Sequence, residues 1–461
     1  MKNFQKLLGG IYLAKAQMMA LCILYFFMAS CYNEPEEADN GIFIVKKIIN
    51  EKNGSYFVRY GLINVNGLLL VGLNYENIAL IGRDYFVGEK RKEVQQYFRI
   101  LDETLLFDKE FEVAKPFSEK GLARVKVKGK WGFINRQGNF IIPPLYDLVG
   151  EFSEGLAPIL IENKVGFINE HGKIIIDPKY EFPTNAKFNS LEHQIESYRF
   201  VHGLCPVVLN SKYGYIDQED KIKVNITYAF ASHFNTELAK VGVELDEEVL
   251  YGIIDKTGQW KIEPKFKNII LDENYFIGFF PGVKNPTNPF DFVKSNNISF
   301  SYFRYDGSKM IDQIFTDAST VDFEYSGWAH KFSEDKAFIC KEGSCGYINK
   351  LGNFVIEPKY FSPGDLFTNG MAAVNFTDNQ NAIISKGNTK EIVQSYRQVG
   401  IIGETGNILI PAVFVYAKIH SGLIEVIPKE YLHMEFLLDK VFYIDYKGNY
   451  IWNGYESMIV K

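Results

Sequence analysis

The sequence predicts an all-β protein, an array of about ten three-stranded β-meander repeats in an open spiral or solenoid or in a propeller-like arrangement. Two observations lead to this prediction. The chain contains 28 Tyr, 38 Phe and 38 Gly, which favours strands and tight turns over helices. One short motif also recurs along most of the chain, as in stacked repeats. Since a single meander cannot bury its own hydrophobic face, neighbouring units must pack on one another.

The repeat consists of two motifs that alternate along the chain. The clearest copy of the first motif runs from Lys130 to Tyr146 and reads KWGFINRQGNFIIPPLY. It recurs at 165–180, 251–266 and 345–360, more loosely from Tyr60, Tyr213 and Val399, and in degenerate form near Phe98, Phe303 and Phe442. The second motif, of the type F-x-x-G-L-A, begins at Phe117, Phe152, Phe200, Phe234 and Phe367.

Each part of a unit follows from its residues. Leu122 to Lys128 alternates apolar and polar residues and predicts a strand, and Trp131 to Asn135 predicts the next strand after a tight turn. A second turn precedes a third strand over Asn139 to Ile142. Pro143 and Pro144 are expected to end that strand, because proline has no N–H to donate to the sheet.

Two sets of glycines have distinct expected roles. Glycine inside a strand indicates the close approach of another chain or ring; this set contains Gly132, Gly166, Gly252 and Gly346. Glycine at the end of an Asn/Asp-x-x-Gly turn supplies a positive φ; this set contains Gly138, Gly172, Gly258 and Gly352. The Asn or Asp that opens each turn, at 135, 169, 217, 255, 349 and 445, is interpreted as a cap on the turn backbone rather than a calcium or carbohydrate ligand.

These motifs resemble the bacterial WG-repeat family, which is named for its Trp-Gly pair. The resemblance extends from Tyr60 to Trp452, although the tryptophan itself is kept only at Trp131. It implies a β-rich repeat protein and provides no catalytic residues to transfer. Ten units exceed the four to eight blades of most propellers, so we expect one continuous array, with two halves divided near 281–300 as the alternative.

The N-terminus has the features of a targeting segment. Three lysines precede an apolar run from Met18 to Ser30, which is shorter than the span of about 20 residues that crosses a bilayer and fits a signal peptide. Met28 to Cys31 resembles a bacterial lipobox. The resemblance implies a signal peptide over 1–30, lipid attachment at Cys31 and an outer-membrane lipoprotein; an uncleaved anchor helix is the alternative. Residues 31–41 form an acidic tether, either an export signal to the cell surface or a solvated linker.

The charge argues against nucleic acid as a partner. Lys and Arg total 50 against 56 Asp and Glu, and removal of the three lysines in residues 1–30 leaves a net charge of −9. A body with this charge has no basic excess for a phosphate backbone and should avoid anionic headgroups.

The cysteines predict at most one disulfide in the mature body. Cys340 and Cys345 flank a turn over 341–344, and paired hairpin strands would bring them within disulfide range in an oxidising compartment. Two free, partly buried thiols are the alternative. Cys205 lies near His202 on a strand-like segment, where a metal site is not expected.

The search for catalytic motifs is negative: the sequence contains no HExxH, GxSxG, Walker or GxGxxG pattern. Glu119 and Glu154 are interpreted as solvated loop charges, His171 as an exposed turn residue, and the repeated aromatics as core rather than sugar platforms. Insertions at 181–199, 281–301 and 375–398 are read as surface loops, with a binding face as the alternative.

The sequence therefore predicts a non-enzymatic cell-envelope lipoprotein without a cofactor or metal, which acts as a repeat scaffold for a protein or glycan ligand. The alternative is an envelope hydrolase or glycan-processing enzyme with its site in an inserted loop.

Overall fold

The computed structural model describes thirteen stretches of the chain, and the rest of this section concerns them alone. They are residues 41–50, 56–118, 120–182, 191–245, 248–280, 298–317, 331–341, 344–361, 365–376, 382–386, 389–393, 398–429 and 441–452. Cys31 and the signal and tether segments lie outside them, as do Glu119, His330 and His433. Within these stretches, no helix has the length and hydropathy needed to cross a membrane.

The described strands form ten consecutive antiparallel units. The first five contain β1 (Ile42–Asn50), β2 (Tyr56–Asn64), β3 (Leu69–Tyr75); β4 (Asn77–Ile81), β5 (Tyr85–Arg91), β6 (Val94–Arg99); β7 (Val113–Phe117), β8 (Leu122–Val127), β9 (Lys130–Asn135), β10 (Phe140–Tyr146); β11 (Leu148–Val149), β12 (Leu156–Ile161), β13 (Lys164–Asn169), β14 (Ile174–Glu181); and β15 (Cys205–Leu209), β16 (Lys212–Ile216), β17 (Ile222–Tyr228).

The last five units contain β18 (Phe230–Ala231), β19 (Leu238–Leu245), β20 (Glu248–Asp255), β21 (Trp260–Phe266); β22 (Asn268–Leu271), β23 (Phe276–Phe280), β24 (Ile298–Phe303), β25 (Phe315–Asp317); β26 (Ala337–Lys341), β27 (Ser344–Ile348), β28 (Phe354–Tyr360); β29 (Met371–Asn375), β32 (Val399–Gly403) and the start of β33 (Ile408–Ile419); and the end of β33 with β34 (Ile424–Pro428), β35 (Phe442–Ile444), β36 (Tyr450–Trp452). The long strand β33 joins the ninth and tenth units in one sheet. β30 (Ala382–Lys386) and β31 (Thr389–Val393) form a separate hairpin inserted between β29 and β32.

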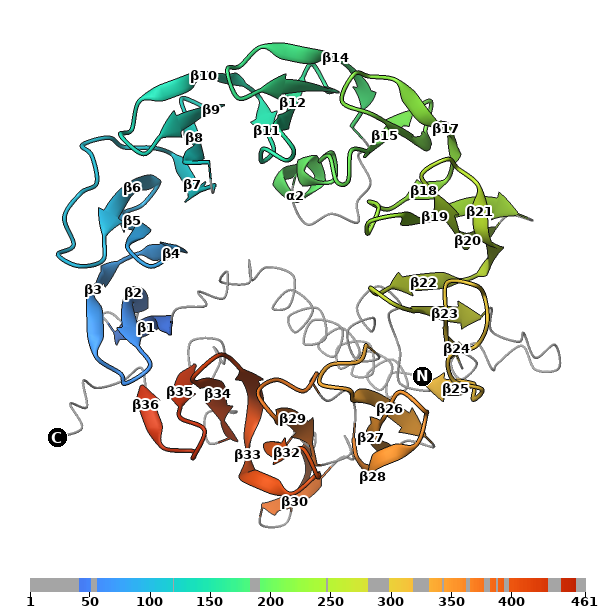
Figure 1. Ribbon diagram of the computed structural model, residues 1–461. Coiled ribbons are helices and arrows are strands. Elements are labelled where there is room, and N and C mark those ends of the chain that lie inside the picture. Colours follow the sequence, from blue (N-terminus) through green and yellow to red (C-terminus); the bar gives the residue numbers. More distant parts are fainter. Residues whose placement is uncertain are drawn as a thin grey trace, which may run out of the picture.

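The units follow one another around a ring, so the all-β repeat prediction is confirmed in its propeller-like form (Figure 1). The strand that follows the Asn/Asp turn, or the equivalent turn at Gly403 in the ninth unit, is here called the third strand. It lies toward the outside of the ring, as β10 and β14 show. β7 and the short helix α2 (Leu191–Glu196) lie toward the inside.

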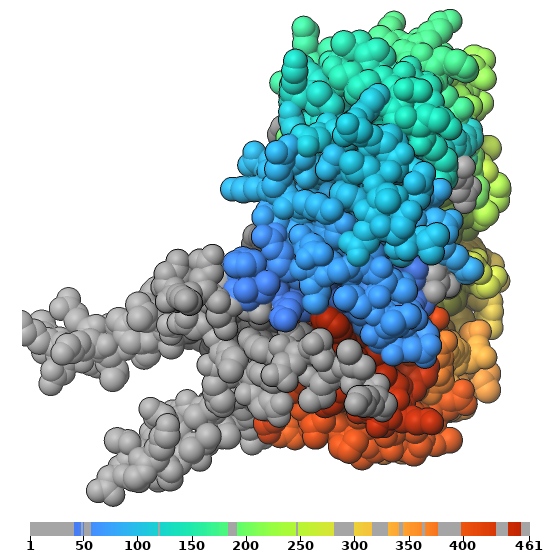
Figure 2. All heavy atoms as spheres, turned by 90° about the vertical axis from the view of Figure 1, so that its left-hand side faces the viewer, coloured from blue at the N-terminus to red at the C-terminus, as the bar shows by residue number. Residues whose placement is uncertain are grey.

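The ring is closed, so the structure has the propeller-like arrangement of the two that the sequence left open. One hydrophobic cluster contains Val45 and Ile63 of the first unit and Leu423, Ile427 and Tyr443 of the last unit. In Figure 2 the surfaces of these two units, blue and red, lie against each other. We call this contact the seam.

The insertion near 281–300 does not divide the chain into two halves. β23 pairs with β24 across it, with Phe276 opposite Phe303 and Phe280 opposite Ser299. Both sides of the insertion therefore belong to one unit, and the sheet continues the ring.

The glycine inside each central strand makes room for the third strand of the same unit. A Cβ at Gly132 would lie 2.5 Å from the carbonyl oxygen of Ile142 and 2.7 Å from the nitrogen of Pro144. Gly166, Gly252 and Gly346 meet the same backbone in their own units. The close approach therefore comes from the third strand of the same unit, and at Gly252 the indole ring of Trp260 on that strand adds to it, 2.7 Å from the Cβ position.

The prolines do not end the third strand, contrary to the sequence prediction. β10 continues through Pro143 and Pro144 to Tyr146, with a register shift between Ile142 and Tyr146. A proline is tolerated there because a bulge on an edge strand leaves N–H groups out of the ladder in any case. The glycine and the proline of the motif thus act together: the bulge of the third strand, which contains the proline, packs closely on the central strand at the glycine, where there is no side chain.

The turns behave as their Asn or Asp predicts. The Oδ1 atom of Asn135 accepts hydrogen bonds from the N–H groups of Gln137 (3.0 Å) and Asn139 (2.9 Å). Gly138 has a φ of 76° and its N–H donates to the Asn135 carbonyl. The capping interpretation is confirmed at the other five positions, Asn169, Asp217, Asp255, Asn349 and Asp445, where the same two backbone N–H groups donate to Oδ1.

Neighbouring units are joined by a recurring tyrosine. The hydroxyl of Tyr97 donates to the carbonyl of Lys115, that of Tyr215 to Ser232, and that of Tyr347 to Asp365, over 2.6–2.9 Å. Tyr215 and Tyr347 lie on the central strands β16 and β27, and Tyr97 lies on β6. In each case the acceptor lies 17 or 18 residues later, in or beside the segment that leads into the next unit.

Candidate functional site

The residues that the sequence singled out within the repeat lie in the core or in the turns. Trp131 is 2% exposed and stands on β9 between Lys126 on β8 and Tyr146 on β10. Its counterpart Cys345 in the eighth unit is also buried. Because these side chains face the interior, they support the ring and present nothing to a ligand.

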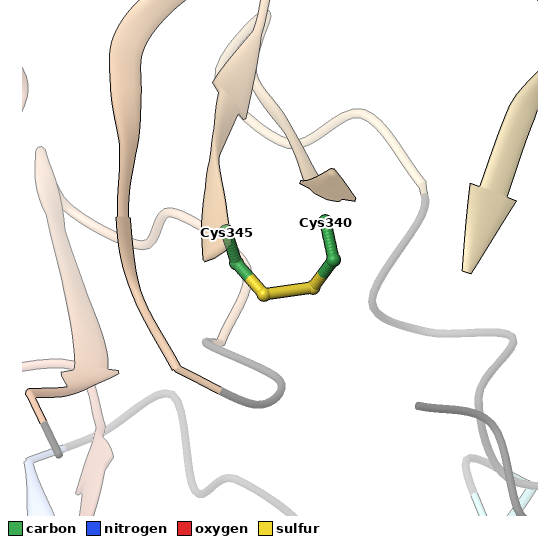
Figure 3. Close-up of a disulfide and its surroundings, with 2 residues drawn as sticks. All are labelled: Cys340 and Cys345. Carbon is green, nitrogen blue, oxygen red and sulfur yellow. A yellow bond between two sulfur atoms is a disulfide. The ribbon is translucent and has the colours of Figure 1, made fainter. Parts of the chain in front are cut away.

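A disulfide joins Cys340 and Cys345 in the structure (Figure 3). The two residues are opposite each other on β26 and β27, with their Cα atoms 3.9 Å apart. Lys341 pairs with Ser344, so the expected four-residue turn is shorter, and its two connecting residues lie outside the described part of the chain. The disulfide therefore clamps one hairpin, and both cysteines pack in a hydrophobic cluster of the eighth and ninth units.

The described residues were searched for clusters of metal-binding side chains and for reactive groups with a shifted pKa. They contain no group of three or more His, Cys, Asp or Glu side chains that could hold a metal ion. Burial raises the pKa of the Cys205 thiol, which makes it a poor nucleophile. Burial, and the charge of Arg199, lower the pKa of His233 to about 4, so this imidazole is neutral near pH 7 and far from the range of an efficient general base.

The described end of the first insertion, residues 191–199, packs into the core, which corrects its interpretation as a surface loop. Ile195 and Tyr198 are 0% and 2% exposed and pack in the cluster of the third and fourth units. The buried guanidinium of Arg124 on β8 holds Glu196 of α2 (2.5 Å) and Glu151 (3.0 Å). α2 is therefore a fixed feature of the inner side of the ring.

Glu154 is an exposed turn residue, as expected, but it also has a partner in the next unit. Its carboxylate accepts a hydrogen bond from the N–H of Gly203 in the next unit, at 2.9 Å. Glu334 accepts from the N–H of Gly370 in the same way. These acids link the turns of neighbouring units, a role that position in the sequence could not reveal because the acceptor and donor are about a unit apart.

The exposed apolar surface gathers at the outer strands. Most of the large hydrophobic side chains that face solvent belong to third strands or directly precede one. We call this set the outer rim; it contains Leu68, Leu69, Phe140, Ile141, Leu145, Ile174, Ile175, Ile222, Val355, Ile408, Leu409, Val413 and Tyr450. Exposed apolar side chains that gather in patches mark interaction sites on soluble proteins.

The outer rim was not predicted, although the sequence holds a signal for it. Phe140-Ile141-Ile142, Ile174-Ile175-Ile176 and Ile408-Leu409-Ile410 are apolar triplets in strands whose side chains alternate between two faces. Ile142, Ile176 and Ile410 are buried. The middle residue of each triplet must therefore face outward, and the first is exposed because the strand bulges at the edge of its sheet.

The outer edges are poor templates for an added strand. Pro144 and Pro178 are in the bulges of β10 and β14, where proline offers no N–H and the register is broken. A partner on the outer rim would therefore contact side chains, and would not extend the sheets.

Comparison with known proteins agrees with the repeat assignment. A family model described as "WG containing repeat" matches residues 102–131, 131–164, 166–182, 251–277 and 346–379. The chain contains WG repeats. A search of curated protein sequences finds no match.

Solved structures that resemble the WG-repeat ring are β-rich and distant in sequence. A eukaryotic initiation factor has a TM-score of 0.46 at 8% identity, covering 88% of this chain and 94% of that one. BamB from Moraxella catarrhalis has a TM-score of 0.32 at 10% identity (65% and 92% covered), and the C-terminal WD40 domain of Sif2 has 0.24 at 12% (42% and 65% covered). Similarity at this level concerns the fold and says nothing about function.

Proposed function

We propose that this WG-repeat ring is a non-enzymatic scaffold of the bacterial cell envelope, attached to the outer membrane by a lipid on Cys31, which binds a partner protein. The observation that supports the scaffold most strongly is the outer rim, where apolar side chains face solvent on or beside the third strands of seven of the ten units. A repeat array that displays the same side chains many times suits a broad docking surface.

The chemistry of the outer rim favours a protein over a glycan. Sugar rings are bound by exposed aromatic faces, but the largest fully buried side chains of the described residues are Trp, Tyr and Phe, Trp131 among them. The exposed rim residues are mainly Ile, Leu and Val, with Phe140 and Tyr450 as the aromatic members. Aliphatic surface is buried most readily against another apolar protein surface.

The best-formed part of the outer rim is the pair of neighbouring strands β10 and β14. Phe140, Ile141 and Leu145 lie on β10, which has no charged residue, and Ile174 and Ile175 lie on β14. Leu145, at 65% exposed, is the most accessible of the five. We propose this pair of strands as the protein-docking sector.

Photocrosslinking in intact cells tests the docking sector. A photoreactive amino acid at Ile141 should yield a discrete cross-linked product with a second protein, and the yield should fall in an Ile175→Glu background. A matched probe at Lys128, an exposed turn residue of the same unit, should yield none. Equal products from both positions, or none from Ile141, would contradict a docking role for β10 and β14.

A Cys31→Ala variant tests the anchor separately. It should lose membrane retention or keep its signal segment, because the modified cysteine is the attachment point that the lipobox resemblance implies. A variant that fractionates with the membrane at the size of the mature protein would show that Cys31 is not the anchor.

A further inference from the structure

We infer that the sector of the outer rim around the seam rests on the lipid surface to which the chain is tethered. This inference rests on the proposed lipid anchor and adds a second contact to it, with an uncharged lipid surface as the occupant. The seam sector contains Val65, Leu68 and Leu69 of the first unit, Ile408 and Leu409 on β33, and Tyr450 on β36.

The tether enters the ring beside this sector. β1 begins at Ile42, which pairs with Asn64, the residue that opens the turn before Leu68. A Cβ on Gly41 would lie 2.8 Å from Cγ1 of Val65. The tether of residues 31–41 spans at most about 40 Å when fully extended. Its entry point must therefore stay close to the membrane, and the exposed apolar residues nearest to that point face the same region.

The apolar surface is continuous across the seam. A Cβ on Gly67, which precedes Leu68, would lie 3.0 Å from Ile451, the neighbour of Tyr450. A Cβ on Gly448, just before Tyr450, would lie 3.7 Å from Ile410, which follows Ile408 and Leu409. Three third strands from three consecutive units thus place their exposed residues side by side next to the tether.

Charge separates this sector from most of the outer rim. β3 (LLVGLNY), β36 (YIW) and the first seven residues of β33 (ILIPAVF) contain no charged residue. β14, β17, β21 and β28 each contain at least one lysine, and three of them also contain an acid. A body with a net charge of −9 is repelled by anionic headgroups, but an uncharged sector with aliphatic side chains and a tyrosine suits the boundary of a zwitterionic bilayer.

β10 is also uncharged, so apolar chemistry alone does not select the membrane contact. The selection comes from the tether, since β10 lies in the third unit and the tether enters the first. A bilayer is flat and the outer rim is circular, so only the sector next to the anchor can stay in contact. The two apolar sectors therefore have different occupants, lipid at the seam and protein at β10 and β14.

Fluorescence quenching by labelled lipid tests the inference. The lipidated full-length protein is placed in phosphatidylcholine vesicles that contain a nitroxide-labelled lipid, with a fluorophore on either Leu69→Cys or Ile222→Cys. Both residues are the first of their third strands and both are exposed, at 45% and 57%. Labelling is selective because Cys205 is buried and Cys340 is bonded to Cys345.

The fluorophore at position 69 should be quenched several-fold more strongly than that at position 222. Equal quenching, or none at position 69 in a protein that sediments with the vesicles, would overturn the inference and leave the anchor intact. Failure of the protein to sediment would refute the anchor and this inference together. Concentration-dependent shielding of position 69 without lipid would identify a second copy of the chain as the occupant and would also overturn it.

Discussion

The chain crosses every internal junction of the ring and does not cross the seam. Contacts of the same kind nevertheless occur at the seam and at internal junctions. At the seam the hydroxyl of Tyr443 donates to the carbonyl of Ile44 at 3.0 Å, as the hydroxyl of Tyr347 donates to Asp365 at 2.9 Å. The first and last units meet as any two neighbours in sequence meet.

The turn glycines show the same equivalence. A Cβ on Gly352 would lie 2.6 Å from Ile311 of the preceding unit, and one on Gly67 would lie 3.0 Å from Ile451 of the last unit. The seam adds a hydrogen bond from Nε1 of Trp452 to the carbonyl of Lys46, at 3.4 Å. The comparison teaches that side-chain contacts are sufficient to pack two units together, because the same contacts occur at the seam, where the two units are not consecutive in the chain.

The largest expected effect comes from a turn glycine. Gly352→Val should cost about 2–5 kcal/mol of unfolding free energy, because φ is +85° and the new side chain collides with Ile311. Gly155→Val is the control for backbone strain alone, since φ is +87° and no atom lies within 4 Å. Gly67→Val should resemble Gly352→Val in a denaturant melt. If it resembles Gly155→Val instead, Gly67 has no neighbour across the seam.

Removal of the disulfide should have a smaller effect, confined to one internal unit. Cys340→Ser with Cys345→Ser should cost about 2 kcal/mol, because the cross-link closes only a short loop in the unfolded chain. Limited proteolysis should open the hairpin of β26 and β27 before the seam. Peptide mapping without reduction checks the premise, and free thiols at both positions in protein from the envelope would remove it.

The junction tyrosines should have equal and modest effects. Tyr443→Phe and Tyr347→Phe should each cost about 1 kcal/mol, because each leaves a carbonyl without its donor. Denaturant melts of the two variants compare the seam with an internal junction directly. If Tyr347→Phe lowers the free energy of unfolding by about 1 kcal/mol and Tyr443→Phe does not lower it, the hydrogen bond from Tyr443 to Ile44 does not form in solution.

The smallest expected effect is the loss of turn capping by Asp255 at low pH. The hydroxyl of Thr257, with the other donors around it, lowers the pKa of Asp255 to about 2. Asp255 therefore stabilises its turn fully above about pH 4, its ordinary pKa, and this contribution is lost as the pH falls toward 2. Asn64 holds the equivalent turn beside the seam with a neutral amide. Hydrogen exchange between pH 4 and 2 should accelerate at 255–259 and not at 64–68, and Asp255→Asn should remove the difference.

The repeat and its turns could be predicted because they depend on local chemistry. The positive φ of Gly138 and the capping by Asn135 follow from a four-residue pattern. The number of units follows from the spacing of the motif. Even Phe98, Phe303 and Phe442, which mark degenerate copies, lie on strands of separate units, namely β6, β24 and β35.

Two kinds of feature could not be predicted: ring closure, which depends on small rotations between units, and contacts between residues that are distant in the sequence. Closure is set by the rotation between successive units, summed around the ring, so ten units alone did not distinguish a ring from a spiral. The burial of Ile195 and the partners of Arg124 and Glu154 depend on residues from other units. The apolar triplets were visible, but only the bulge at Pro144 shows which of their residues face outward.

An engineered disulfide across the seam tests ring closure most directly. A Cβ on Gly422 would lie 3.9 Å from the Cβ of Val65, within the range of about 3.5–4.5 Å found in disulfides. The control pairs Val65→Cys with Gly203→Cys, which has a similar positive φ and no atom within 4 Å.

The measurement is electrophoresis without reductant after mild oxidation of dilute protein. Val65→Cys with Gly422→Cys should form an intramolecular cross-link that joins the first and last units and increases the mobility of the monomer, while the control pair should not. Free thiols at positions 65 and 422, or cross-links between molecules only, would show that the ring is open in solution.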